Sequence, residues 1–171
     1  ESVPFGGVPA ADAALPEGLR LIAWTEETGA RVDPAAPVEA DAVYYALVRP
    51  VLREDAVFLF PDEYGLLRPE SAMTHAECAA ALRALAPEER LTPALLASLD
   101  AEPDGVLTRE ELKTALDALF DPEAVEPVLE SLPAMESENA ARAELAYSVC
   151  RLLGAESAAE DVYYPDVAPS H

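Results

Sequence analysis

The stretch Asp100-Ala101-Glu102-Pro103-Asp104-Gly105-Val106-Leu107-Thr108-Arg109-Glu110-Glu111 carries the most specific pattern in the chain. Oxygen-bearing groups stand at its first, third, fifth, seventh, ninth and twelfth positions, and a glycine stands at the sixth, where the backbone must turn sharply. Calcium binds about six to eight hard oxygen ligands arranged in this way. The stretch therefore predicts a calcium site made by Asp100, Glu102, Asp104, the carbonyl group of Val106, Thr108 and Glu111.

This spacing is that of an EF-hand loop, which joins two helices. Apolar residues flank the loop as such helices require: Leu95, Leu96 and Leu99 before it, and Leu112, Leu116 and Phe120 after it. The sequence offers no second loop of this quality, so we expect weak binding in which calcium acts as a structural staple between two helices. One alternative stays open, because an Asp-Gly turn followed by a capping box of Thr108 and Glu111 uses the same residues.

Outward from this loop, helix signals dominate the chain, and the predicted fold class is all-α. Alanine and leucine are abundant, which favours helices. Pro16, Pro93 and Pro122 stand where first helical turns begin, and Gly29 and Gly154 stand where helices end. The expected helices are 16–28, 39–49, 75–86, 93–100, 109–120, 122–131 and 140–153, and residues 57–60 are expected to be extended.

A short motif recurs along the chain and indicates repeated helix–loop–helix units. Met73-Thr74-His75-Ala76-Glu77-Cys78 matches Leu107-Thr108-Arg109-Glu110-Glu111-Leu112, and Ala140-Ala141-Arg142-Ala143-Glu144-Leu145 repeats it more loosely. The three glutamates lie 34 and then 33 residues apart. We expect a helical segment over 1–86, the EF-hand-like unit over 87–121 and a further helical segment over 122–171, which can also pack as one domain.

The order of several short segments resembles S-layer homology modules, which occur in bacterial surface proteins. The resemblance lies in Pro4-Phe5-Gly6-Gly7-Val8-Pro9, in Tyr64-Gly65-Leu66-Leu67-Arg68-Pro69 followed by Met73 to Glu77, and in Tyr163-Tyr164-Pro165-Asp166-Val167 near the end. It implies helical units, a place at the cell surface or outside the cell, and binding of a cell-wall polysaccharide. The residues that it implies for polymer binding are Thr74, His75, Glu77, Arg142 and Glu144.

Charge and composition exclude several other functions. The formal net charge is −22, so nucleic acid and anionic membrane surfaces are unfavourable partners. No apolar run approaches the roughly 18 residues that a membrane-spanning helix needs. Two histidines, two cysteines that we expect to be buried free thiols, and the lack of a phosphate-binding loop or zinc-ligand cluster predict a protein that is not an enzyme. The expected partners are calcium and either a wall polysaccharide or another surface protein.

Overall fold

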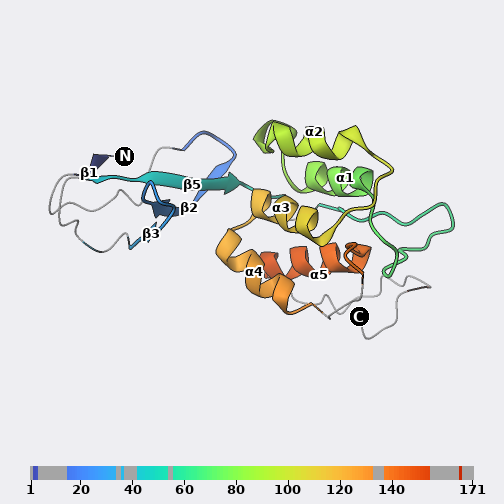
Figure 1. Cartoon of the computed structure of the whole chain (residues 1–171). Helices are drawn as coiled ribbons and strands as arrows, with labels where there is room; N and C mark the ends of the chain where they lie inside the picture. The colour runs from blue at the N-terminus through green and yellow to red at the C-terminus, as the bar shows by residue number, and fades with distance from the viewer. Residues whose placement is uncertain are drawn as a thin grey trace. The chain divides into compact units, whose positions relative to one another are not determined.

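The computed structural model describes residues 2–3, 15–33, 36, 42–53, 56–132, 137–154 and 166. Its contacts divide the chain into two compact units, Glu1–Val51 and Leu52–His171 (Figure 1). The segments 4–9 and 163–171, which carry part of the resemblance to S-layer homology modules, lie outside the described residues except for Asp166.

The first unit contains an antiparallel sheet of three strands in the order β3-β2-β5. Its strands are β2 (Leu19–Thr25), β3 (Arg31–Val32) and β5 (Tyr45–Pro50), and a separate pair joins β1 (Ser2–Val3) to β4 (Ala42–Val43). Trp24 and Tyr44 form its small buried cluster, against which Leu21 and Val32 pack.

The prediction of an all-α fold is wrong, because the first unit is built from strands. The expected helix 16–28 is β2 with the turn that follows it, and the expected helix 39–49 contains β4 and most of β5. Leucine and alanine in β2 favour a helix locally, but pairing with β5 outweighs this weak preference. Gly29, expected to end a helix, has a φ of +85° in the turn between β2 and β3, where an L side chain is disfavoured.

The described part of the second unit is helical, and the five α-helices in it fall where the sequence predicts them. They are α1 (His75–Leu85), α2 (Pro93–Ala101), α3 (Arg109–Leu119), α4 (Pro122–Glu130) and α5 (Arg142–Leu153), with a short 3-10 helix, η1 (Glu88–Arg90), before α2. Pro93 and Pro122 lie in the first turns, where a missing N–H costs nothing. Gly154 ends α5 in the left-handed conformation, as expected. None of the described helices is long and apolar enough to cross a membrane.

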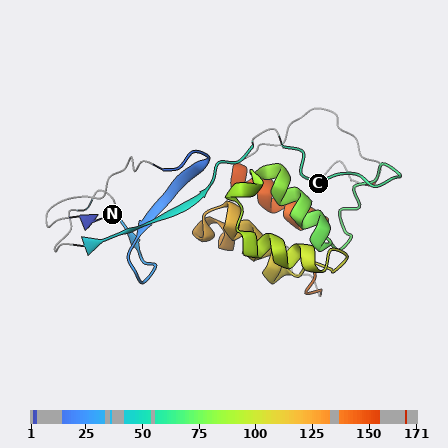
Figure 2. The ribbon, with the colours of Figure 1, turned by 90° about the horizontal axis from the view of Figure 1, so that it is seen from above.

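The apolar faces of these helices meet in one core. Helix α1 packs against α2 and α3, and α4 packs against α3 and α5 (Figure 2). Fully buried leucines from α1, α3 and α5 line this core, and each contributes about 1.5–3 kcal/mol relative to an exposed position. Residues 57–60 form no strand, although Phe58 and Leu59 pack against the core. The core thus brings the first turns of α1, α3 and α5 together.

Candidate functional site

Three copies of the recurring motif meet through their backbones. Residues 73–77, 107–111 and 140–144, here called the motif segments, lead into α1, α3 and α5. The N–H of Met73 donates to the carbonyl of Ala140 (2.9 Å), that of Ala140 to Leu107 (2.8 Å), and that of Leu107 to Met73 (2.8 Å). All three residues have no exposed surface. The motif segments therefore form a closed ring of buried hydrogen bonds, here called the motif ring.

A second set of backbone hydrogen bonds joins the same three repeats, with the donors running in the opposite order round the ring. The third residue of each motif segment donates its N–H to a loop of another repeat: His75 to Gly105 (2.9 Å), Arg109 to Glu138 (3.0 Å) and Arg142 to Ser71 (3.0 Å). Each acceptor stands two residues before its own motif segment. Each segment is thus joined to the other two in the same way, which is the arrangement of a threefold internal repeat.

Capping boxes begin the helices of the ring. In the first, Thr74 accepts from the N–H of Glu77, whose carboxylate accepts from the N–H of Thr74. Thr108 and Glu111 repeat this at α3. At α5 only half of the box exists: Glu144 accepts from the N–H of Ala141 (3.0 Å), but alanine has no side-chain acceptor.

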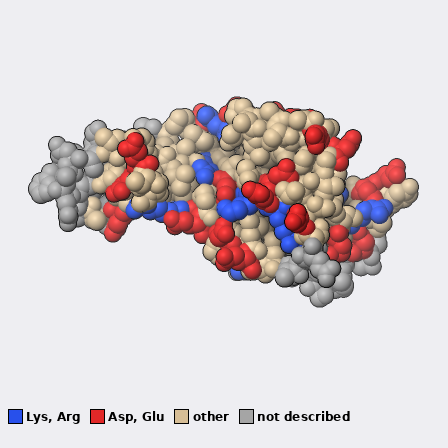
Figure 3. All heavy atoms as spheres, viewed as in Figure 1, with Lys and Arg blue, Asp and Glu red and all other residues tan. Residues whose placement is uncertain are grey.

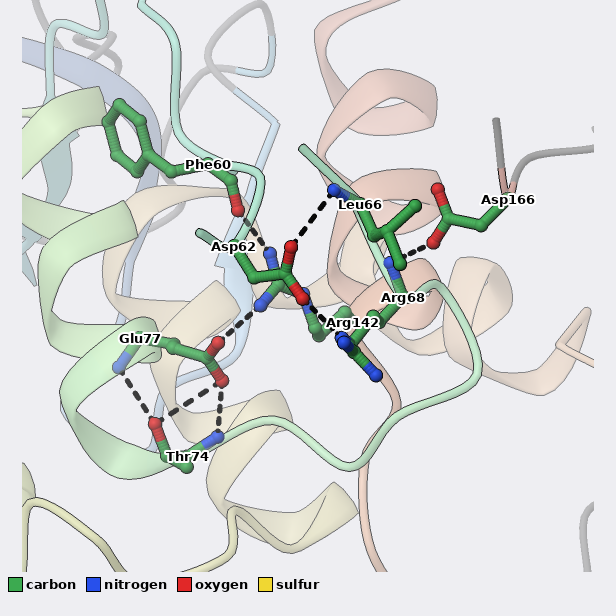
Figure 4. A network of polar contacts seen from close by, with 8 residues as sticks. All are labelled: Phe60, Asp62, Leu66, Arg68, Thr74, Glu77, Arg142 and Asp166. Atoms are coloured by element: carbon green, nitrogen blue, oxygen red, sulfur yellow. Dashed lines mark hydrogen bonds and ion pairs between the residues drawn. The ribbon is translucent and has the colours of Figure 1, made fainter. Parts of the chain in front are cut away.

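The same glutamates also pair with basic side chains from other repeats. Arg142 pairs with Glu77 (Figure 4), the Nη2 of Arg109 lies 2.5 Å from Glu144 Oε1, and the Nε2 of His75 lies 3.4 Å from Glu111 Oε2. In each pair the basic residue and the glutamate come from different repeats. The basic residue of the first repeat pairs with the glutamate of the second, that of the second with the third, and that of the third with the first. Each motif glutamate therefore caps its own helix and binds a neighbouring repeat.

The five residues expected to bind polymer all lie in this ring. Thr74, His75, Glu77, Arg142 and Glu144 bond to one another or to other ring residues. His75, Arg142 and Glu144 are buried. Their contacts join the repeats to one another, which makes them positioning residues for the unit.

Arg109 is a charged residue of the ring that was not among the expected site residues. The sequence places it at the tenth position of the calcium loop, but the recurrence of the motif aligns it with His75 and Arg142. Its hydrogen bonds to Glu144 raise the pKa of the Arg109 guanidinium above its ordinary range. The recurrence is therefore the sequence signal that could have identified Arg109.

The expected calcium loop occupies one joint of this ring. Asp100 lies in the last turn of α2, and its Oδ2 lies 2.6 Å from the Nη2 of Arg83. Glu111, the expected bidentate ligand, uses Oε2 to accept from the N–H and the hydroxyl of Thr108, both at 2.8 Å. Within the described residues, which include the entire loop, no three His, Cys, Asp or Glu side chains are grouped so that they could hold a metal ion. Asp100 and Glu111, the first and last expected ligands, therefore bond to other protein groups, those of Arg83 and Thr108.

Gly105 has a packing role in this joint. A Cβ atom at this position would lie 2.9 Å from the carbonyl oxygen of Glu102 and 2.9 Å from the Nδ1 of His75. The glycine therefore allows the imidazole to approach the loop and to reach Glu111. The capping box that the sequence left open as an alternative is present here.

Electrostatics around His75 follow from these contacts. The backbone N–H of Thr108, followed by its hydroxyl and then by His75, lowers the pKa of Glu111. Burial, followed by the charge of Glu111, raises the pKa of the Cys78 thiol to about 12. Cys78 is a buried free thiol as expected and stays protonated at neutral pH, whereas Cys150 is exposed, contrary to expectation.

A second polar network fixes the loop that precedes the first motif segment (Figure 4). The carboxylate of Asp62 accepts from the N–H groups of Tyr64 (2.8 Å) and Leu66 (3.0 Å), and it lies 2.5 Å from the Nε of Arg68. The carboxylate of Asp166 accepts from the N–H of Arg68 (2.5 Å) and from that of its neighbour Leu67 (3.1 Å). Backbone hydrogen bonds lower the pKa of both carboxyl groups, and Arg68 adds to the effect at Asp62.

Comparison of the chain with protein-family models, with curated proteins and with solved structures gave no match. The geometry of the second unit and the order of its motifs therefore carry the functional argument. Acidic side chains are spread over the face in Figure 3, and basic side chains lie among them. This distribution agrees with the net charge of −22.

Proposed function

We propose that the protein is a non-enzymatic attachment module of a bacterial cell surface, and that its helical unit binds a cell-wall polysaccharide. The observation that carries this proposal is the motif ring, in which three copies of one motif make equivalent joints between helices. The order of motifs is the one that resembles S-layer homology modules, and the copies of the motif occupy equivalent positions in the ring.

A repeated unit suits a repeated ligand. A polysaccharide presents the same sugar many times, and several similar surfaces on one rigid unit increase the overall affinity through a high effective concentration. The ring makes the helical unit rigid, because each motif segment is bonded to the other two. Rigid presentation reduces the conformational entropy lost on binding.

The proposal is tested by sedimentation of the intact protein with purified bacterial cell walls. One wall sample keeps its polysaccharide, and a matched sample has had it removed by acid. We expect the protein to sediment with the first sample and to stay in solution with the second. Equal binding to both samples, or binding to neither, would contradict the proposal.

Calcium binding by residues 100–111 remains a separate prediction, favoured by the spacing of its oxygen ligands. In the present structure Asp100 pairs with Arg83, and Glu111 accepts hydrogen bonds in its capping box, so calcium would compete with these partners for the two carboxylates. The geometry therefore favours the capped turn.

A thermal melt in chelator, in calcium and in magnesium separates the two states of the loop. Calcium at 100 times its dissociation constant contributes about 2.7 kcal/mol to stability, which raises Tm by very roughly 5–10 °C. A rise of this size with calcium alone, and its loss in Glu111→Gln, would support the metal site. An unchanged Tm in all three buffers would leave the loop as a capped joint.

A further inference from the structure

Two aromatic side chains are exposed on the loop that precedes the first motif segment. Phe60 is 54% exposed and Tyr64 is 72% exposed, and Val57 on the same segment is 65% exposed. Both views of the chain show this segment, in teal to green, extending away from the helices (Figures 1 and 2). Single exposed apolar residues are ordinary, but several on one loop indicate a contact surface when the loop is held in place.

The segment is anchored to the helical unit from its inner side. Phe58 and Leu59 pack against the core, which directs their neighbours outward. The carbonyl of Phe60 accepts a hydrogen bond of 2.5 Å from the Nη2 of Arg142, a residue of the motif ring. Figure 4 shows the Phe60 ring turned away from this polar network.

The turn that carries Tyr64 is fixed independently. Asp62 bonds to the N–H of Tyr64, to the N–H of Leu66 and to the side chain of Arg68. Arg68 itself has a φ of +48°, a conformation that a non-glycine residue adopts at a cost in energy. The carboxylate of Asp166, 98 residues away in the sequence, accepts a hydrogen bond of 2.5 Å from the backbone N–H of Arg68. These contacts hold the loop in one conformation without burying its aromatic side chains.

We infer that Phe60 and Tyr64 form an aromatic platform on which neutral sugar rings of the wall polysaccharide stack. The inference rests on the proposed function and names the surface and the class of sugar. An aromatic side chain offers a large, rigid apolar face, and tyrosine adds a polar tip. Fixing such side chains before binding avoids the entropy cost of ordering them.

The charges around the platform select a neutral, hydroxyl-rich ligand. Glu63, which is exposed, precedes Tyr64 directly in the sequence, and a carboxylate only accepts hydrogen bonds, which sugar hydroxyls donate. The guanidinium of Arg68 is paired with Asp62, and the net charge of the chain is −22. An anionic polymer would therefore be repelled here. A protein partner is also less suitable, since glutamate and aspartate are depleted at the centres of protein interfaces.

The test compares variants of the intact protein on protease-treated cell walls that keep their polysaccharide. The double variant Phe60→Ala/Tyr64→Ala removes the platform. Tyr147→Ala, which removes another exposed aromatic side chain from α5, is the matched control. Because Phe60 and Tyr64 are exposed, the double variant is expected to melt at the wild-type temperature, and Phe60→Tyr is expected to retain binding.

We expect the double variant to bind about tenfold more weakly or worse, the Tyr147 control to bind like the wild type, and binding to persist when salt is raised. If the double variant binds the walls as tightly as the wild type, the platform is overturned and the proposed function stands. Loss of binding in high salt would overturn the neutral class of sugar. Binding that requires untreated, protein-containing walls would replace the sugar with a protein. If the wild type binds no walls at all, the proposed function fails as well.

Discussion

At the scale of single residues, each motif glutamate has two tasks. Glu77 caps α1 and also pairs with Arg142 from the third repeat. A residue with both tasks links the start of a helix to the position of a neighbouring repeat. Removing one partner of such a pair leaves the other partly buried without its counter-charge.

Arg142→Met is expected to lower the free energy of unfolding by about 2–4 kcal/mol, because Glu77 and the Phe60 carbonyl both lose a charged donor. Methionine keeps the apolar stem, so the loss reports the charge. Urea unfolding measures the loss of stability. Glu77→Gln and the double variant Arg142→Met/Glu77→Gln complete a double-mutant cycle. The double variant should lose less than the sum of the single losses. A strictly additive result would mean that the pair does not couple the repeats.

The lowered pKa of Glu111 predicts a specific loss of stability in acid. Below the ordinary glutamate pKa of about 4.3, the unfolded chain takes up this proton before the folded protein does, so stability falls as pH drops through the lowered value. Glu111→Gln should flatten the stability profile in this range. Urea midpoints between pH 5 and the acid limit of folding measure the effect. Glu110→Gln, a neighbouring exposed carboxylate, is the control, and equal profiles for the two variants would contradict the prediction.

At the scale of elements, the α-helices of the second unit were predictable because their signals are local. The prolines of α2 and α4 and the capping boxes of α1 and α3 lie within four residues of the helix starts. The strands were not predictable in the same way, since β2 is defined by pairing with β5, whose partner residues lie 20 (Thr25 with Tyr45) to 31 (Leu19 with Pro50) positions further along the chain. Leucine and alanine in β2 fit a helix equally well until that partner is known.

The incomplete capping box of α5 predicts a stabilising substitution. Ala141→Ser supplies the acceptor that Thr74 and Thr108 provide in the other repeats, and we expect a gain of about 0.5–1 kcal/mol. Thr108→Ala removes the equivalent acceptor and should cost about 1 kcal/mol. Thermal and urea unfolding of the two variants measure both changes. A destabilised Ala141→Ser variant would show that the buried site does not accept the hydroxyl group.

The calcium motif shows why a site is harder to predict than a helix. A threonine followed three residues later by glutamate serves both an EF-hand loop and a capping box. The recurrence of the motif places Glu111 with Glu77 and Glu144, and all three glutamates cap helices in the ring, whereas calcium binding stays a prediction. Arg109 becomes a ring residue by the same comparison.

At the scale of the whole molecule, the contacts form two compact units, and the ring unites the second of them. The first and last motif segments are bonded directly, although Met73 and Ala140 lie far apart in the sequence. A closed ring has no terminal repeat, so the loss of any one joint weakens all three repeats. We therefore expect the second unit to unfold in one cooperative step.

Amide hydrogen exchange, followed by NMR, tests the motif ring most directly. The account predicts that the amides of Met73, Leu107 and Ala140 exchange at one slow rate set by global unfolding of the unit, and that Arg142→Met speeds all three by the same factor. Exchange of one ring amide at the rate of an exposed loop, or acceleration confined to Met73 and Ala140 in the variant, would contradict the closed ring.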